Sequence, residues 1–160
     1  MNRIEVFMKK KKIALLILTF ILFLTGCGKK SISTSKFIST LENLNYNVYD
    51  QTPMIEKAEL KNTNSYVTAV SNDKNINIAF LEMDSEKSAI DNYEDAVFGL
   101  ESDNSFVSIK EVKKKNYKKF TGNDEKYYYV VIRLKRTYLY AYSKIESKNL
   151  LDNVIENIGY

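Results

Sequence analysis

Two hydrophobic periodicities alternate along the chain beyond residue 30. Apolar residues recur at helical spacing in three segments, at about 35–45, 84–100 and 144–158. Between them lie short runs rich in β-branched and aromatic residues, at 46–50, 66–71, 76–83, 106–112, 117–121, 126–134 and 137–143. The stretch 53–64 begins with the only proline and is expected to be a loop with one helical turn. The pattern predicts the order α-β-β-β-α-β-β-β-β-α.

Short polar connections between these runs favour antiparallel pairing. Residues 72–75 separate two strands, and Lys135-Arg136 separates the last two. Run 76–83 is apolar on both sides, as in a central strand. We expect an α+β fold: a mainly antiparallel sheet with helices packed on one face. A divergent α-β-β-β repeat is an alternative interpretation of the two halves, although no residue-level identity supports it.

The helix ends have recognisable signals. Asp84 is expected to cap the second helix, and Ser143 with Glu146 fits a capping box for the last helix. Gly159 follows that helix and is expected to close it, because glycine accepts the left-handed conformation there.

The N-terminal segment has the layout of an export signal. Four lysines at Lys9–Lys12 precede thirteen uncharged residues, 13–25, and Lys29 and Lys30 follow. This pattern is typical of a secretory signal peptide, because a transmembrane helix needs about 20 apolar residues. Met8 is an alternative start, since Met1 to Phe7 adds Glu5 to a region that normally lacks acids.

The end of the apolar run carries a specific motif, Leu24-Thr25-Gly26-Cys27. It matches the lipobox at every position, and the chain here resembles bacterial lipoproteins. The resemblance implies cleavage before Cys27, a diacylglyceryl thioether on Cys27, and a lipid anchor at the outer face of the cytoplasmic membrane. The expected domains are a signal peptide at 1–26, a lipid-anchored tether at 27–34 and a single α+β domain at 35–160. An uncleaved signal anchor with a chance cysteine is the alternative.

The rest of the layout carries a looser resemblance. With its tyrosine-rich hairpin and a terminal helix ending in Gly159-Tyr160, it resembles small uncharacterised lipoproteins of Gram-positive bacteria. That resemblance implies no particular activity.

The charge balance changes once the signal is set aside. The chain holds 24 basic and 20 acidic residues, and residues 1–26 account for the whole excess of +4. The remaining chain is neutral, so nucleic acid is not an expected partner. Residues 31–108 hold 5 lysines against 13 acids, while 109–160 hold 12 bases against 6 acids. We interpret this as an acidic helix lying near a basic hairpin; a polar partner surface is the alternative.

The residue inventory offers little for catalysis. There is no histidine, and the one cysteine is assigned to the lipid. No glycine-rich phosphate loop and no calcium-binding loop is present in the sequence. We therefore predict a non-enzyme with no metal and no cofactor, whose soluble domain is a monomer. An enzyme using carboxylate and lysine chemistry is the weak alternative.

Two features could carry recognition. The first is a basic run, which could contact phosphates of lipid headgroups or of an anionic cell-wall polymer. It comprises Lys110, Lys113, Lys114, Lys115, Lys118 and Lys119. The favoured interpretation is a solvated strand edge, because lysines discourage edge-to-edge aggregation.

The second feature is a face of the last hairpin. If Lys135-Arg136 is a two-residue turn, Leu134 pairs with Thr137 and Val130 with Ala141, which directs the aliphatic side chains toward the helices. The opposite face then carries Val131 and the candidate binding residues Tyr127, Tyr129, Arg133, Tyr138, Tyr140 and Tyr142. A surface of this composition is typical of contacts with a protein or a glycan, here a partner in the cell envelope. Packing under the protein's own chain is the favoured alternative. The predicted function is a lipid-anchored, non-catalytic binding module, with a purely structural envelope lipoprotein as the alternative.

Overall fold

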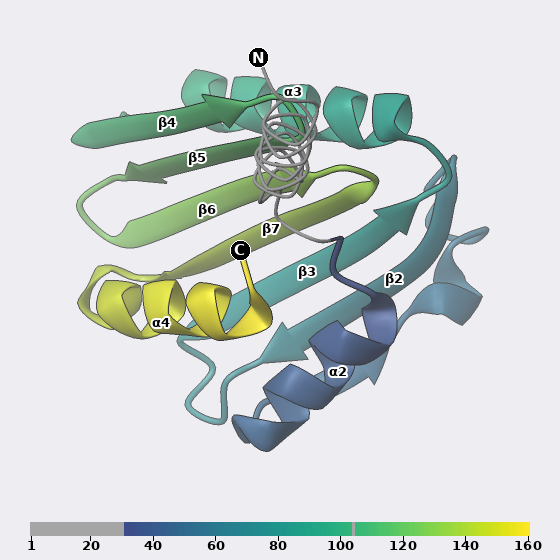
Figure 1. Cartoon of the computed structure of the whole chain (residues 1–160). Coiled ribbons are helices and arrows are strands. Elements are labelled where there is room, and N and C mark those ends of the chain that lie inside the picture. The colour runs from purple at the N-terminus through teal and green to yellow at the C-terminus, as the bar shows by residue number, and fades with distance from the viewer. Residues whose placement is uncertain (1–30, 104) are drawn as a thin grey trace, which may run out of the picture.

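A computed structural model describes residues 31–103 and 105–160. Seven strands form one antiparallel sheet in the order β1-β2-β3-β7-β6-β5-β4 (Figure 1). In chain order the elements are α2 (Thr34–Asn43), β1 (Asn47–Asp50), the 3-10 turn η1 (Thr52–Met54), β2 (Thr63–Val70), β3 (Ile76–Met83), α3 (Glu86–Asp103), β4 (Ser108–Lys114), β5 (Tyr117–Asn123), β6 (Tyr127–Leu134), β7 (Thr137–Lys144), the 3-10 turn η2 (Ile145–Ser147) and α4 (Lys148–Ile158). The predicted order and the α+β class are confirmed. The signal peptide, the lipobox and Cys27 lie outside the described residues.

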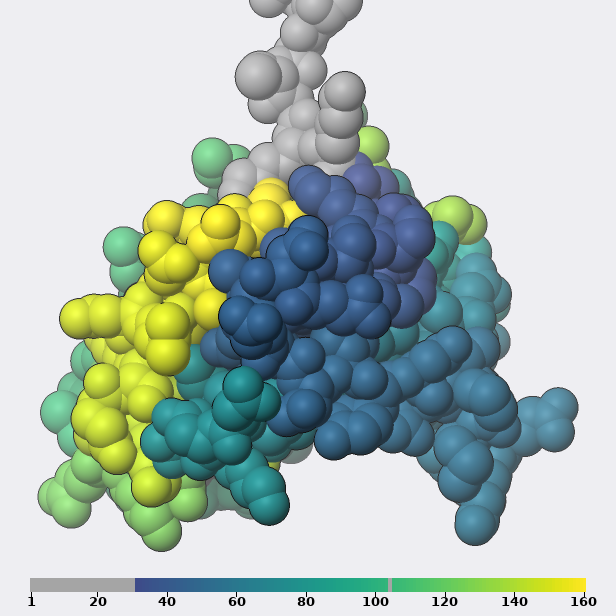
Figure 2. All heavy atoms as spheres, turned by 90° about the horizontal axis from the view of Figure 1, so that it is seen from below, coloured from purple at the N-terminus to yellow at the C-terminus, as the bar shows by residue number. Residues whose placement is uncertain are grey.

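The helices cover both faces of the sheet, which corrects the expectation that they share one face. The buried side chains of α2 and α4, among them Phe37, Leu41, Leu151 and Ile155, join one core cluster. Helices α2 and α4 lie side by side on that face (Figures 1 and 2). The buried side chains of α3, Ala89, Tyr93 and Leu100, join a second cluster on the other face.

The strands themselves explain this two-sided cover. Side chains alternate between faces along a strand. In β6, Val130 and Ile132 point toward α2 and α4, while Val131 between them packs in the α3 cluster. In β3, Phe80 and Leu81 divide in the same way. A strand that is apolar on both sides needs a helix on each side, and α3 supplies the second one.

The same arrangement limits the idea of an internal repeat. The meanders β1-β2-β3 and β5-β6-β7 lie on either side of the antiparallel β3–β7 contact. The two meanders could be related only by a two-fold axis perpendicular to the sheet. Such an axis would place the helices of both repeats on the same face of the sheet. Because α2 and α3 lie on opposite faces, the symmetry does not extend to the helices.

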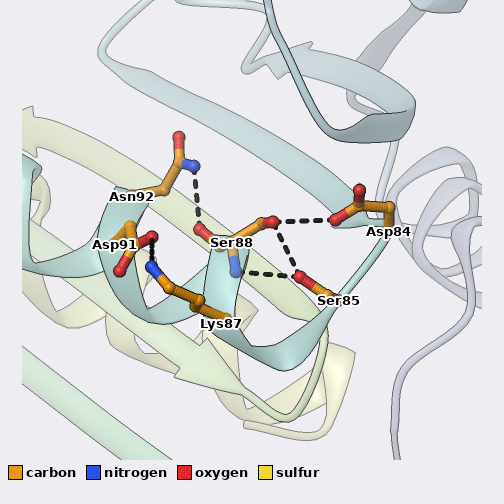
Figure 3. A network of polar contacts seen from close by, with 6 residues as sticks. All are labelled: Asp84, Ser85, Lys87, Ser88, Asp91 and Asn92. Atoms are coloured by element: carbon orange, nitrogen blue, oxygen red, sulfur yellow. Dashed lines mark hydrogen bonds and ion pairs between the residues drawn. The ribbon is translucent and has the colours of Figure 1, made fainter.

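Helix α3 begins with a serine cap rather than the expected aspartate cap. Ser85 Oγ accepts a hydrogen bond from the Ser88 backbone N–H at 3.1 Å (Figure 3). Asp84 contacts the cap only through a side chain: its carboxylate accepts a hydrogen bond from the Ser88 hydroxyl at 2.7 Å. The expectation failed because the hydroxyl of Ser85 lies closer to the free N–H groups than the carboxylate before it.

Helix α4 also begins differently from the expectation. Ser143 is completely buried within β7, and η2 separates it from the helix, so the capping box with Glu146 does not form. The end of the helix is as expected: Gly159 has φ 111° and donates its N–H to the carbonyls of Ile155 and Glu156. Across residues 31–103 and 105–160, none of the helices combines the length and apolar character that crossing a membrane requires.

Candidate functional site

The last hairpin has the predicted register. Leu134 faces Thr137, and Val130 faces Ala141, across the two-residue connection Lys135-Arg136. Lys135 has φ 53°, which lets the chain reverse within two residues. The register brings the predicted tyrosines to one face of β6 and β7, opposite α2 and α4.

Helix α3 divides that tyrosine face into a covered and an open part. Arg133 is 3% exposed and Tyr138 is 8% exposed, and Tyr138 packs in the α3 cluster. These two residues therefore leave the candidate binding set, since the helix covers their end of the hairpin. The other four side chains are partly exposed. We call them the tyrosine platform: Tyr127, Tyr129, Tyr140 and Tyr142.

The platform is a continuous group of rings. Tyr127 and Tyr142 lie 6.2 Å apart between centroids, and Tyr129 and Tyr142 lie 6.4 Å apart. Tyr140 continues the row at 6.3 Å from Tyr142. The four rings line a shallow hollow of about 190 Å³. Contacts between tilted aromatic rings at this distance are favourable and limit side-chain movement.

A second hollow extends the platform across the sheet toward β2. It has a volume of about 180 Å³ and lies against Tyr140 and Tyr142. Thr68 and Asn77 contribute polar groups to its lining, while Val70 and Ala79 contribute apolar surface. No charged side chain of the described residues lines either hollow. The two hollows are therefore aromatic and hydrogen-bonding, and charged groups lie beside them, at Asp124 next to Tyr129 and at Lys126 over the Tyr127 ring.

The phenol groups of Tyr129 and Tyr140 stay protonated in neutral solution. Partial burial and the nearby Asp124 carboxylate raise the pKa of Tyr129 to about 12. Burial and the neighbouring Tyr142 raise the pKa of Tyr140 as well. Tyr129 also donates its hydroxyl to Asp124 Oδ2 at 3.4 Å. The hydroxyls can thus act as hydrogen-bond donors without carrying charge.

A glycine contributes to the platform in a way that sequence reasoning missed. Gly122 lies opposite Tyr129 in the sheet, and a Cβ atom built there would lie 2.9 Å from the Phe106 ring. Phe106 in turn contacts Tyr129 and Phe120, with centroids 5.9 and 5.8 Å away. The missing side chain makes room for Phe106, which supports Tyr129 from the side. Nothing in the local sequence signals this contact, because it joins two segments 16 residues apart.

The basic run is divided between the two faces of the sheet. Lys118 points to the α3 side, where its ammonium group lies 2.8 Å from Glu94 and 5.5 Å from the Tyr93 ring centroid. Lys119, the next residue, lies on the α4 side with Lys110. The interpretation of an acidic helix near a basic hairpin is confirmed at the Lys118–Glu94 contact. β4 is an edge strand of the sheet, as the favoured interpretation of the basic run requires.

The described residues show no metal-binding cluster of three or more carboxylate or thiol side chains. What the geometry offers is a rigid open surface for binding. Comparison with protein-family models, with curated proteins and with solved structures gave no match.

Proposed function

We propose that this chain is a lipid-anchored, non-catalytic binding module of the cell envelope, whose tyrosine platform binds a neutral glycan. The observation that carries the proposal is the open group of four tyrosines, beside two hollows that no charged side chain of the described residues lines. Tyrosine rings offer an apolar face and a polar hydroxyl to a ligand that has both kinds of surface. A sugar ring has such surfaces, with C–H groups on its faces and hydroxyls at its edge.

The place where the described chain begins supports this arrangement. Ile32 is buried in the core cluster of α2 and α4, close to Gly159. The chain therefore enters the domain on the face opposite the tyrosine platform. A tether attached at this point leaves the platform free to meet a ligand.

The binding test removes two platform rings, Tyr127→Ser and Tyr142→Ser together. We expect affinity for a neutral glycan to fall by about tenfold or more, since aromatic anchors dominate such contacts. Binding is measured by NMR on the full chain in detergent micelles, with a panel of uncharged hexose and N-acetylhexosamine oligomers as probes. The thermal midpoint should fall modestly, because both side chains are only partly exposed and lose favourable ring contacts, so binding is compared at a temperature where the variant is folded.

The matched control removes two exposed apolar residues elsewhere, Phe98→Ser and Leu150→Ser, which are 73% and 52% exposed. This control should bind like the unmodified chain. Equal loss in both variants, or no binding of any neutral oligomer, contradicts the glycan proposal. Capture of a protein through the platform would assign the surface to a protein partner, and a surface without any ligand would favour the structural lipoprotein.

The membrane anchor has its own test. We expect Cys27→Ala to leave the precursor uncleaved and without lipid, because the thioether forms on the cysteine sulfur. Intact mass spectrometry of the membrane-extracted protein measures both changes. Cys27→Ser, which keeps the size of the side chain but lacks the thiol, should fail in the same way. An unmodified chain that begins upstream of Cys27 or carries no lipid there would refute the anchor.

A further inference from the structure

A second candidate site lies on the other face of the sheet, between α4 and the strands β4 and β5. It is a groove of about 520 Å³, which we call the α4–β5 groove. Its ionisable lining residues are Lys110 and Lys119 on the strands and Lys148, Asp152 and Glu156 on α4. The tyrosine platform is on the opposite face, so the two sites are independent.

The groove forms because helix α4 does not cover the whole of this face of the sheet. The apolar stripe of α4 packs in the cluster that contains Val130, Ile132 and Leu139 of β6 and β7. Further out on this face, Lys110 and Lys119 line the groove beside Val112 and Thr121. The groove is therefore a channel of mixed polar and apolar lining, with α4 as one wall and the strands as its floor.

Its lysines are incompletely neutralised. Lys119 Nζ lies 3.8 Å from Asp152 Oδ1, at the limit of an ion pair, and the same carboxylate oxygen accepts a hydrogen bond from the Tyr128 hydroxyl at 3.0 Å. Lys148 Nζ stands 4.8 Å from the Tyr128 ring centroid. Among residues 31–103 and 105–160, no acid lies within ion-pair distance of Lys110.

The balance of these charges indicates the chemical class of the ligand. Three lysines against two carboxylates leave the groove with one excess positive charge. This excess charge attracts an anion, which the three lysines can contact. Hydroxyl groups on the same ligand could donate to those carboxylates. A phosphodiester with polyol substituents meets both conditions.

We propose that the α4–β5 groove binds a phosphodiester, with Lys110, Lys119 and Lys148 as its cationic contacts and Glu156 as an acceptor for its hydroxyls. The diester could belong to a phospholipid headgroup or to a soluble or polymeric glycerol phosphate. The described chain begins on this same face, where Ile32 packs in the cluster of α2 and α4. The experiment therefore tests both sources.

The first arm uses glycerophosphoglycerol and the full chain in maltoside micelles, with phosphorus NMR line broadening as the readout. The Lys110→Gln, Lys119→Gln variant should bind about 25-fold more weakly, if each lysine contributes about fivefold. The matched control, Lys113→Gln with Lys115→Gln, removes the same charge outside the groove and should bind nearly normally. Equal weakening in both variants, or no binding by the unmodified chain, overturns the proposal.

The second arm compares nanodiscs of phosphatidylcholine with nanodiscs that also contain phosphatidylglycerol. Competition between the anionic nanodiscs and the soluble diester would assign the groove to lipid headgroups. Binding of the soluble diester without such competition would assign it to free or polymeric phosphate. Should the double variant fold poorly by circular dichroism, Lys110→Gln alone keeps the test decisive, because Lys110 is exposed and about fivefold weaker binding is expected.

Discussion

Leu151→Ala is expected to lower the free energy of unfolding by about 2–5 kcal/mol, the usual cost of emptying a buried leucine site. Leu151 has no exposed surface and lies in the cluster between α4 and the sheet. The neighbouring helix α2 packs against the same cluster, so the cavity cannot collapse without moving two elements. Urea unfolding followed by circular dichroism measures the loss. Ile155→Ala removes a second fully buried side chain from the same stripe and should fall in the same range.

The adjacent residue supplies the control for this substitution. Leu150 is 52% exposed, so Leu150→Ala is expected to change the stability by less than about 0.5 kcal/mol. Both variants replace a leucine of α4 with alanine, and the two positions differ only in burial. A loss below half a kilocalorie for both Leu151→Ala and Ile155→Ala would mean that the α4 stripe does not face the core.

Hydrophobic period and connection length were sufficient to predict the elements and the last hairpin. The strand expected at 76–83 is β3, with the same limits, because alternation and turn residues are local properties. The register of β6 and β7 follows from the two residues between them, which leave one pairing for every residue of the hairpin. These features need no knowledge of distant contacts.

The placement of α3 could have been predicted but was not. Run 76–83 is apolar on both sides, and a strand of that kind needs cover on both faces. Helices on one face alone would leave half of its apolar side chains in water. Leu81 and Met83 are buried beneath α3, at 5% and 0% exposure. The burial of Tyr138 on the tyrosine face has the same cause, because helix α3 buries both Leu81 and Tyr138.

Other features of the candidate sites depend on tertiary contacts that no sequence pattern signals. The α4–β5 groove forms where α4 stops covering the sheet, and that limit depends on how the helix packs. The basic run appeared as one cluster in the sequence, but its members alternate between faces. Lys118 meets Glu94 on one side, and Lys119 meets Asp152 on the other. The division follows from the period of two in β5, whereas the acidic partners come from two different helices.

The tyrosines also predict how the protein unfolds in alkali. Burial raises the pKa values of Tyr93, Tyr128, Tyr138 and Tyr160, and the carboxylates of Glu111 and Asp152 raise those of Tyr93 and Tyr128 further. An unfolded tyrosine ionises near a pKa of about 10. Below that pH the groups are protonated in both states; above it only the unfolded chain loses protons. The stabilisation is therefore complete below about pH 10 and is lost as the pH rises toward the folded pKa values.

The size of the loss makes it a sharp test. Each such tyrosine lowers the free energy of unfolding by about 1.4 kcal/mol per pH unit, so these four together lower it by about 5 kcal/mol per unit. The free energy of unfolding of a typical domain is only about 5–15 kcal/mol, so we expect cooperative unfolding within two or three pH units above 10. The loss of circular dichroism and the part of the tyrosinate absorbance that comes from these four side chains should occur together. Tyr138→Phe, which fills the same space without an ionisable group, should move the midpoint upward by roughly a third of its distance above pH 10, because three such groups remain instead of four. Tyrosinate absorbance that reaches the full value for all twelve tyrosines while the circular dichroism stays native would show that these four side chains are not buried as described, because a buried phenol ionises only when the sheet and its helices separate.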